Sequence, residues 1–291
     1  MDVVAHTILS LLKKSADHLK SKGSTSPRLD AELLLAEVLG VSRVDLYVNF
    51  EQPLSEAEVD RYRELVRRRA KGEPVAYILG QAYFRNLTLE VGRDVLIPRP
   101  ETEHLVDIAL KVLKSREWRQ PPAVLDLGTG SGAIAIALAV EYPDAVVTAT
   151  ETSSEAQRLA EENARTAGVA ARVVFVQSDM FESLDPVETY DLIVSNPPYV
   201  ADGEWDMLPT DVREFEPRSA LSGGTDGLDF YRRIAAEAPA HLKPRGGLVL
   251  EIGHSQGPAV AGLIEATDHF AEIGVEPDYA GRDRVVVARR Q

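Results

Sequence analysis

Apolar residues recur at helical spacing along the first seventy residues, and this pattern predicts a small bundle of helices. Ser26 and Pro27 form an N-cap with proline at the first helical position, and the leucine-rich segment that follows stops at Gly40. A further helix start is the sequence SEAE, in which Ser55 and Glu58 have the spacing of a capping box. We find no catalytic constellation in this region, so a role in recognition competes with a purely structural one.

Short alternating stretches replace the helical pattern after this bundle. YILGQAYF and LTLEV lie on either side of Arg85 and Asn86, which is typical of a β-hairpin. The next segment, IPRPETE, is a loop restrained by prolines, where Arg99 and Glu101 are candidates for lining a site. We expect a helical substrate-recognition domain at residues 1–73, a hairpin linker at 74–97 and a catalytic domain at 98–291.

From Ala123 onward, strand-like and helix-like segments alternate, beginning with AVLDLG, SGAIAIALAVEY and AVVTAT. This alternation predicts an α/β fold with a mainly parallel, seven-stranded sheet and helices on both faces. The last two strand candidates, HFAEIGV and RVVVARR, are joined by a loop rather than a helix. We therefore expect one edge strand to be antiparallel.

Composition narrows the functional classes. The chain has 291 residues, a net charge of -14 and no cysteine. Its length suits two domains, and the lack of cysteine excludes disulfides and cysteine-bound zinc and fits a cytoplasmic location. An acidic chain repels polyphosphates, so we expect no direct nucleic-acid partner. Charges interrupt the apolar pattern of the amino terminus, so we expect neither a signal peptide nor a membrane span.

The sequence DLGTGSG follows a strand and opens a helix, which is the position of a nucleoside-binding glycine loop. Glycines allow the sharp turn and let a ligand approach the backbone closely. Glu151 ends the next strand, at the spacing where a carboxylate accepts hydrogen bonds from both hydroxyls of a ribose. The candidate cofactor-binding residues of these two segments are Asp126, Gly128, Thr129, Gly130, Ser131, Gly132 and Glu151.

Two features favour S-adenosylmethionine over a dinucleotide. Asp126, just before the glycines, would disfavour a pyrophosphate but suit a sulfonium or an ammonium group. Asp179, after the third strand, could accept a hydrogen bond from an adenine amino group, with Met180 beside the ring. A helix cap and a core methionine are the alternative interpretations of these last two residues.

The fourth strand, YDLIVS, ends in the sequence NPPY at the edge of the sheet where ligands bind in such folds. The prolines hold the backbone extended, so Asn196 is held outward and the Pro197 carbonyl stays outside any ladder. These two acceptors, with Pro198 and the ring of Tyr199, suit a planar NH2 group. We expect all four residues to bind the substrate, Asn196, Pro197 and Tyr199 to be catalytic, and Asn196 also to contact the cofactor.

Several longer motifs then resemble one family. GEPVAYILG, VLIPRPETEHLV, VLDLGTGSGAIAIALA, SNPPYV, DVREFEP, GGTDGLDFYRRI and LEIGHSQG are similar to the HemK/PrmC family, the peptide-chain release factor glutamine N5-methyltransferases. The resemblance implies a Rossmann-like methyltransferase fold, S-adenosyl-L-methionine as donor, S-adenosyl-L-homocysteine as product and no metal. It implies the glutamine of the Gly-Gly-Gln motif in class 1 release factors as substrate, and so a part in translation termination.

Carried over by residue, the resemblance matches the family's glycine loop to Gly128–Gly132, its ribose-binding acid to Glu151 and its substrate motif to Asn196–Tyr199. Aspartate is usual in the family where Glu151 stands, and tryptophan is frequent where Met180 stands. The adenine contact is therefore the least specific part of the match.

Three other functions stay open at this stage. A glutamine methyltransferase of a ribosomal protein shares the NPPY motif, although DVREFEPRSAL looks more like the release-factor branch. An adenine-N6 or other nucleic-acid amino methyltransferase also presents an exocyclic amine to such a motif, but the net charge of -14 argues against it. The third is a nucleotide-binding module without catalysis.

Overall fold

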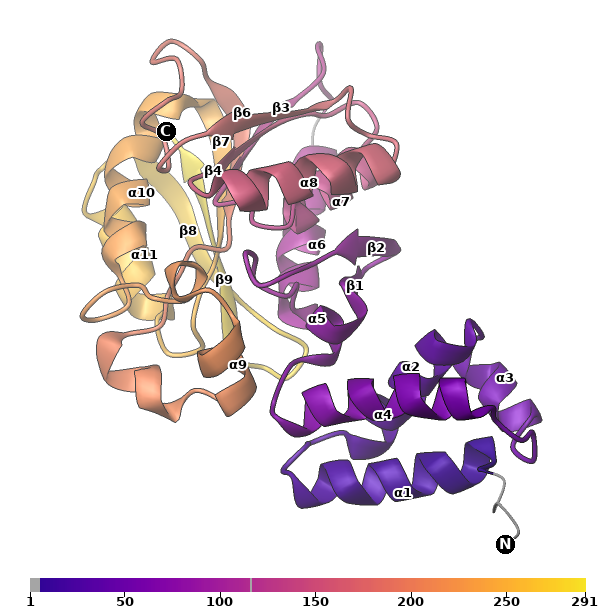
Figure 1. The fold of residues 1–291 in the computed structure, drawn as a ribbon. Coiled ribbons are helices and arrows are strands. Elements are labelled where there is room, and N and C mark those ends of the chain that lie inside the picture. Colours follow the sequence, from indigo (N-terminus) through magenta and orange to yellow (C-terminus); the bar gives the residue numbers. More distant parts are fainter. Residues whose placement is uncertain (1–5, 116) are drawn as a thin grey trace, which may run out of the picture. The chain divides into compact units, whose positions relative to one another are not determined.

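The computed structural model describes residues 6–115 and 117–291 and divides them into two compact units (Figure 1). The helical unit contains the chain up to Gly80 together with Pro209–Phe215. The α/β unit contains Gln81–Leu208 and Glu216–Gln291. Within the described ranges, no helix has both the length and the apolar character needed to cross a membrane.

The helical unit is a bundle around a buried core. Its helices are α1 (Ile8–Ser21), α2 (Pro27–Leu39), α3 (Arg43–Val48), α4 (Glu56–Ala70), α5 (Val75–Leu79) and α9 (Thr210–Phe215). At its centre Tyr62 is buried, and its hydroxyl donates to the Ala31 carbonyl at 3.1 Å. A buried tyrosine hydroxyl needs such a partner, so this bond helps to fix the packing of α4 on α2.

Most of the helix signals in this unit are confirmed. Gly40 ends α2 in the left-handed conformation, and Ser55 and Glu58 form the reciprocal capping box of α4. The exception is Ser26, whose side chain makes no capping hydrogen bond. Its backbone N–H instead donates to the hydroxyl of Ser24, which itself donates to Asp30 at 2.7 Å. Ser26 is therefore the N-cap residue of α2 and Pro27 its first residue, as predicted, but the Ser26 side chain makes no capping bond.

The predicted hairpin is confirmed, with β1 (Gln81–Phe84) and β2 (Leu87–Glu90) antiparallel. The residues just before it, Tyr77–Leu79, are helical rather than extended, because α5 continues until Gly80 adopts a positive φ. Asn163, on the helix α8 (Ser154–Thr166), connects the hairpin to the glycine loop. Its amide oxygen accepts from Glu90 N–H, and its nitrogen donates to the carbonyls of Glu90 and Ser131. The hairpin therefore supports one wall of the site described below.

The α/β unit is built on a seven-stranded sheet in the order β5-β4-β3-β6-β7-β9-β8. Its strands are β3 (Ala123–Leu127), β4 (Val146–Glu151), β5 (Val173–Gln177), β6 (Tyr190–Ser195), β7 (Leu242–Glu251), β8 (Phe270–Pro277) and β9 (Asp283–Arg290). The first five are parallel, as predicted. The reversed strand is β9, which lies between β7 and β8 rather than at the edge. The loop from β8 to β9 is short, so the two strands pair as antiparallel neighbours. The other edge of β9 pairs with β7.

Helices cover both faces of this sheet (Figure 1). One face packs against α6 (Pro100–Lys114), α7 (Ala133–Glu141) and α8 (Ser154–Thr166), and the other against α10 (Asp229–His241) and α11 (Gly257–Glu265). Two 3-10 helices, η1 (Asp202–Met207) and η2 (Arg218–Ala220), lie in the connection from β6 to α10. The buried strands are apolar on both faces, as parallel strands covered on both sides must be.

The sheet has its topological switch point between β3 and β6. These strands are neighbours, and Leu127 at the end of β3 is in register with Ser195 at the end of β6. The Ser195 hydroxyl also donates to the Leu127 carbonyl at 2.8 Å. The glycine loop and the NPPY segment therefore leave the sheet side by side, at the edge where open α/β sheets bind ligands.

Candidate active site

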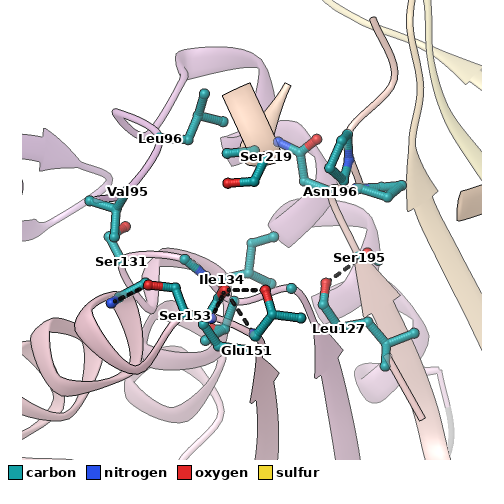
Figure 2. Close-up of a pocket in the computed structure, with 18 of the residues that line it drawn as sticks. Val95, Leu96, Leu127, Ser131, Ile134, Glu151, Ser153, Ser195, Asn196 and Ser219 are labelled. Carbon is teal, nitrogen blue, oxygen red and sulfur yellow. Dashed lines mark hydrogen bonds between the residues drawn. The ribbon is translucent and has the colours of Figure 1, made fainter. Parts of the chain in front are cut away.

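A cavity of about 290 Å³ opens at the carboxyl ends of these strands (Figure 2). Its walls come from four segments: the loop before α6, the glycine loop with the end of β4, the turn after β5, and the NPPY segment with η2 and α10. Figure 2 shows Glu151 and Asn196 on opposite sides of this cavity. The predicted residues that line it are Arg99, Gly128, Thr129, Gly130, Ser131, Glu151, Asp179, Met180, Asn196, Pro197 and Pro198.

The glycine loop combines a tight turn with an open ligand face. At Gly130 φ is +55°, and a Cβ there would meet no atom within 4 Å, so the backbone faces open space. Gly132 has φ +83°, but a Cβ there would lie 2.8 Å from Ile136 Cδ1 and 3.2 Å from Ala160. Gly130 is therefore open to a ligand, whereas Gly132 is required for packing of the loop on α7 and α8 and does not line the cavity.

Asp126 lies beneath the loop rather than in the cavity wall. It is fully buried, and its Oδ2 accepts from the Thr129 hydroxyl at 2.6 Å and from the Ala135 N–H in the first turn of α7 at 3.2 Å. Burial raises the pKa of this carboxyl to about 7, against the opposing effect of these two hydrogen bonds. Asp126 was expected to contact a cofactor directly, but it does not line the cavity. It instead stabilises the glycine loop by its hydrogen bonds to Thr129 and Ala135.

Glu151 is held by the loop that it faces. Its Oε2 accepts from Gly130 N–H at 2.9 Å, and its Oε1 accepts from the N–H groups of Thr152 and Ser153 at 2.9 and 3.0 Å (Figure 2). A carboxylate offers about four lone-pair positions, so Oε2 keeps acceptor capacity toward the cavity. These bonds fix the orientation of the carboxylate before any ligand arrives.

The turn after β5 carries the two other predicted residues. Asp179 is half-exposed and accepts from Arg233 Nη1 at 2.8 Å, so one of its oxygens is already engaged. Met180 is buried among the residues packed on α10, yet it also lines the cavity. Its φ is +56°, which is uncommon for a residue other than glycine and tends to occur at functional sites. Both residues line the cavity and can contact a ligand there, although Asp179 also forms an ion pair with Arg233.

Asn196 presents its amide at the opposite side of the cavity. Its Nδ2 donates to the hydroxyl of Thr102 at 3.1 Å, and this bond leaves Oδ1 as the end available to a ligand. Among the described residues, no hydrogen bond to the Pro197 carbonyl is formed, and Pro197 and Pro198 both line the cavity. The structure therefore brings together the two acceptors that the sequence predicts.

Tyr199 is not among the residues that line this cavity. Its side chain packs against the core cluster that includes residues of β7, α10 and α11, and its carbonyl accepts from Gln256 Nε2 at 3.0 Å. Burial raises the pKa of its hydroxyl. The expected aromatic floor is thus not part of the cavity in this structure; the ring instead anchors the end of the NPPY segment to the protein core.

Sequence reasoning missed several lining residues, some of which lie inside the motifs VLIPRPETEHLV and GGTDGLDFYRRI but were assigned no role there. Thr102 is buried in the first turn of α6, beside Arg99, which lines the cavity, and Glu101, which does not. The remaining unpredicted lining residues include Asp94, Val95, Leu96, Ser153, Ser219, Phe230 and Arg233. The prolines of IPRPETE were the available signal, since they indicate a fixed loop without indicating which side chain faces the site.

These features restrict the chemistry. One side of the cavity offers an open glycine backbone and an oriented carboxylate, which suit the ribose of a nucleoside-containing ligand. The other side offers two neutral acceptors, which suit an NH2 group whose hydrogens both need partners. The arrangement fits the transfer of a group from a nucleoside-containing donor to an amide or amine nitrogen.

Comparisons with known proteins agree with this geometry. The PrmC N-terminal domain family matches residues 10–80, and the methyltransferase small domain family matches residues 103–211. A protein of Geobacter sulfurreducens named release factor glutamine methyltransferase is 45% identical over 283 residues, which cover 97% of this chain and 96% of that protein. A protein of Rhodopirellula baltica with the same name is 43% identical over 285 residues, covering 96% and 95%.

The solved structures that are similar show the fold. A 16S rRNA methyltransferase of T. thermophilus, in complex with AdoMet and guanosine, has a TM-score of 0.52 at 21% identity. The match covers 72% of this chain and 50% of that chain. It supports a methyltransferase fold for the α/β unit.

Proposed function

Because this chain belongs to the release factor glutamine methyltransferase family, we propose that it methylates the glutamine of the Gly-Gly-Gln motif in class 1 peptide chain release factors. The methyl group comes from S-adenosyl-L-methionine and is transferred to the side-chain amide nitrogen, N5. The observation that carries this proposal is the pair of acceptors, Asn196 Oδ1 and the Pro197 carbonyl, across one cavity from Glu151.

The residues of the glycine loop fit the donor. The open backbone at Gly130 accommodates its amino-acid and ribose portions at close range, and Glu151 Oε2 accepts from a ribose hydroxyl. Asp179 and Met180 hold the adenine, with Asp179 accepting from the exocyclic amine by the oxygen that Arg233 leaves free. Asp126 contributes indirectly by holding Thr129 and the first turn of α7.

The NPPY segment prepares the acceptor nitrogen. An amide nitrogen delocalises its lone pair and is a poor nucleophile, so its orientation matters more than its basicity. Asn196 Oδ1 and the Pro197 carbonyl each accept one hydrogen of the glutamine NH2 group, which directs the face of the nitrogen toward the methyl carbon. Orientation of this kind can lower the barrier by about 7 kcal/mol in favourable cases.

The bound donor supplies an electrophilic methyl group on a sulfonium. The new bond forms between the glutamine nitrogen and this methyl carbon while the carbon–sulfur bond breaks, and its electron pair stays on sulfur. The nitrogen then loses a proton, which Asn196 or Pro197 holds in a hydrogen bond until water removes it. Once the methyl group has been added, the nitrogen carries a positive charge and its proton is strongly acidic. A strong base is therefore not required to remove it.

We assign substrate recognition to the helical unit. Its match to the PrmC N-terminal domain covers residues 10–80. The short helix α3 exposes three apolar side chains, Val44, Tyr47 and Val48, which suit contact with a protein partner. Under this proposal residues 1–73 bind the release factor, residues 74–97 link the two parts, and residues 98–291 perform the transfer.

A methyl-transfer assay with competing acceptors tests the proposed activity. The protein is incubated with labelled S-adenosylmethionine and, in separate reactions, with a release factor, a release factor whose motif glutamine is replaced by alanine, a ribosomal protein, and DNA or RNA. Label is expected in the unaltered release factor alone. Label in the ribosomal protein or the nucleic acid, with none in the release factor, would contradict the proposal.

A further inference from the structure

A second cavity, of about 540 Å³, opens in the α/β unit at the edge of the sheet opposite the catalytic cavity. Its walls come from the end of α6 and from the strands β6, β7, β8 and β9. Asp191, the second residue of β6, lines it, whereas Ser195 at the other end of the same strand lines the catalytic cavity. Pockets that bind small molecules usually measure about 300–1,000 Å³, so this cavity has room for one.

Both acidic side chains that line this second cavity already have a basic partner. Glu272 and Arg289, which both line it, form an ion pair at 3.2 Å between β8 and β9. Asp191 accepts from Lys243 Nζ at 2.7 Å and from the Ala123 N–H at 2.9 Å. The two carboxylates are therefore neutralised by these partners.

Two further cations, Lys111 and Arg245, line the second cavity without a counter-charge. Within the part of the chain that the structure describes, neither side chain takes part in a hydrogen bond or an ion pair. Lys111 belongs to the last turn of α6, whose dipole contributes only about half a negative charge. The cavity thus keeps a net charge of about +1.5, although the chain as a whole carries -14.

The backbone around the second cavity is irregular at two separate places. Arg245 has a φ of +63° and Glu272 a φ of +51°, in the left-handed region that residues other than glycine rarely adopt. An irregularity in the pairing of β6 with β7, and another in that of β8 with β9, accompany these conformations. Strained residues and β-bulges are concentrated at functional sites, and Met180 gives the same signal in the catalytic cavity. These irregularities therefore favour a ligand site over an ordinary charged surface.

The ligand that suits two free cations is a dianion. A phosphate monoester has its second pKa at about 6, so near neutral pH it carries close to two negative charges. A nucleic-acid backbone carries a single charge per phosphate, and its length would expose it to the net negative charge of the chain. Val112, Val287 and Ala288 also line the cavity and offer apolar contact to the rest of a small ligand.

We propose that this second cavity binds a small organic phosphate monoester, with its dianion between Lys111 and Arg245 and its carbon skeleton against Val112 and Val287. The Arg245 guanidinium can donate two parallel hydrogen bonds to phosphate oxygens, and Lys111 supplies a compact positive charge. The site lies outside the catalytic cavity, so it goes beyond the methyl transfer proposed above and does not depend on it.

Titration of the full chain with inorganic phosphate and with phenyl phosphate, followed by phosphorus NMR, tests this site. Both anions should bind at millimolar concentration or below, and phenyl phosphate more tightly because of its apolar ring. Lys111→Gln and Arg245→Gln should each weaken the binding of phenyl phosphate at least about tenfold, because each removes a charge-assisted hydrogen bond. Lys114→Gln is the matched control, since Lys114 is exposed in the same turn of α6 but does not line the cavity. Arg245→Lys keeps the charge and should retain most of the affinity.

Absence of binding to the wild type, or an equal affinity in Lys111→Gln, Arg245→Gln and Lys114→Gln, would overturn the proposal. A single-stranded oligonucleotide that displaces phenyl phosphate and binds more tightly would also overturn it and would indicate a nucleic-acid site. Lys111 is exposed on the surface of α6, so its variant decides the question even where a substitution at Arg245 disturbs the strand. None of these measurements involves methyl transfer, so their failure is distinct from a failure of the proposed function.

Discussion

Arg99 and Glu216 form an ion pair at 2.5 Å between segments that are 117 residues apart in the sequence. The Glu216 side chain is 1% exposed, and its second oxygen accepts from the Ile97 N–H at 3.3 Å. This carboxylate therefore holds the proline-restrained loop before α6 to the segment that follows NPPY. Because Arg99 lines the cavity, the pair also fixes the shape of the site.

Replacing Glu216 should loosen that loop. Glu216→Ala leaves Arg99 without its buried partner and should lower the free energy of unfolding by about 2 kcal/mol, less than for a fully buried pair because Arg99 is partly exposed. It should also weaken donor binding. Glu216→Gln keeps an acceptor for Ile97 and serves as the matched control, with smaller losses. Urea unfolding and donor titration measure both effects, and an alanine variant equal to the wild type in both would contradict this role.

The glycine loop offers a matched pair of substitutions. Gly132→Ala places a Cβ 2.8 Å from Ile136 Cδ1 and should destabilise the fold by about 1–3 kcal/mol from overpacking. The Cβ added by Gly130→Ala meets no protein atom within 4 Å. Apart from the strain of its positive φ, this substitution should therefore act mainly by obstructing the bound ligand. We expect urea unfolding to show the larger loss for Gly132→Ala. Titration with S-adenosylhomocysteine should show the larger loss for Gly130→Ala, and the reverse pattern would contradict these assignments.

Asp126 should make stability fall as the pH rises. Its pKa is raised from 3.8 to about 7 in the folded protein, so the folded state keeps a proton that the unfolded state has released between these values. The contribution of this carboxyl group to the free energy of unfolding is fully present below pH 3.8 and is lost as the pH rises through about 7. Asp126→Asn carries no charge and should lose this part of the pH dependence.

Urea unfolding of the wild type and Asp126→Asn, near pH 5 and near pH 8, checks this prediction. The stability of Asp126→Asn relative to the wild type should be higher at the higher pH. Glu251 titrates in the same direction in both proteins and so cancels from the comparison. An equal difference at the two pH values would show that the Asp126 carboxyl is not penalised by burial.

The exposed side chains of α3 should matter for the protein substrate. Val44 is 69% exposed and Val48 is 75% exposed. Replacing both by glutamate should raise KM for the release factor at least about tenfold, which corresponds to about 1.4 kcal/mol, and leave donor affinity unchanged. Val187→Glu is the control, because Val187 is a valine of the α/β unit that is even more exposed, at 83%. An unchanged KM in the double variant would remove α3 from the recognition surface.

The sequence predicted the parts of the fold that depend on local rules. Capping at Ser55, the stop at Gly40 and the alternation of strands and helices all follow from residues close together in the chain. The position of β9 was not predictable in this way, since its place between β7 and β8 depends on which strand edge is free when it folds back. Ser26 lies at the predicted N-cap position, although its side chain makes no capping hydrogen bond.

The same distinction holds for the site. The glycine loop, Glu151 and Asn196 were found because motifs place them at the carboxyl edge of the sheet. The depth of Asp126 and the direction of the Tyr199 ring depend on packing against other elements, which the motifs do not encode. Thr102 is joined to Asn196 across 94 residues of sequence, and nothing around either residue indicates that contact.

Mass spectrometry of a release factor co-expressed with this protein tests the central claim most directly. With the wild type, the peptide that contains the Gly-Gly-Gln motif should carry a single methyl group, located by fragmentation on the glutamine side chain. With Asn196→Ala, which loses one of the two acceptors, this methyl group should be nearly absent even though the purified variant still binds the donor. An unmethylated glutamine with the wild type, or full methylation with Asn196→Ala, would contradict the account.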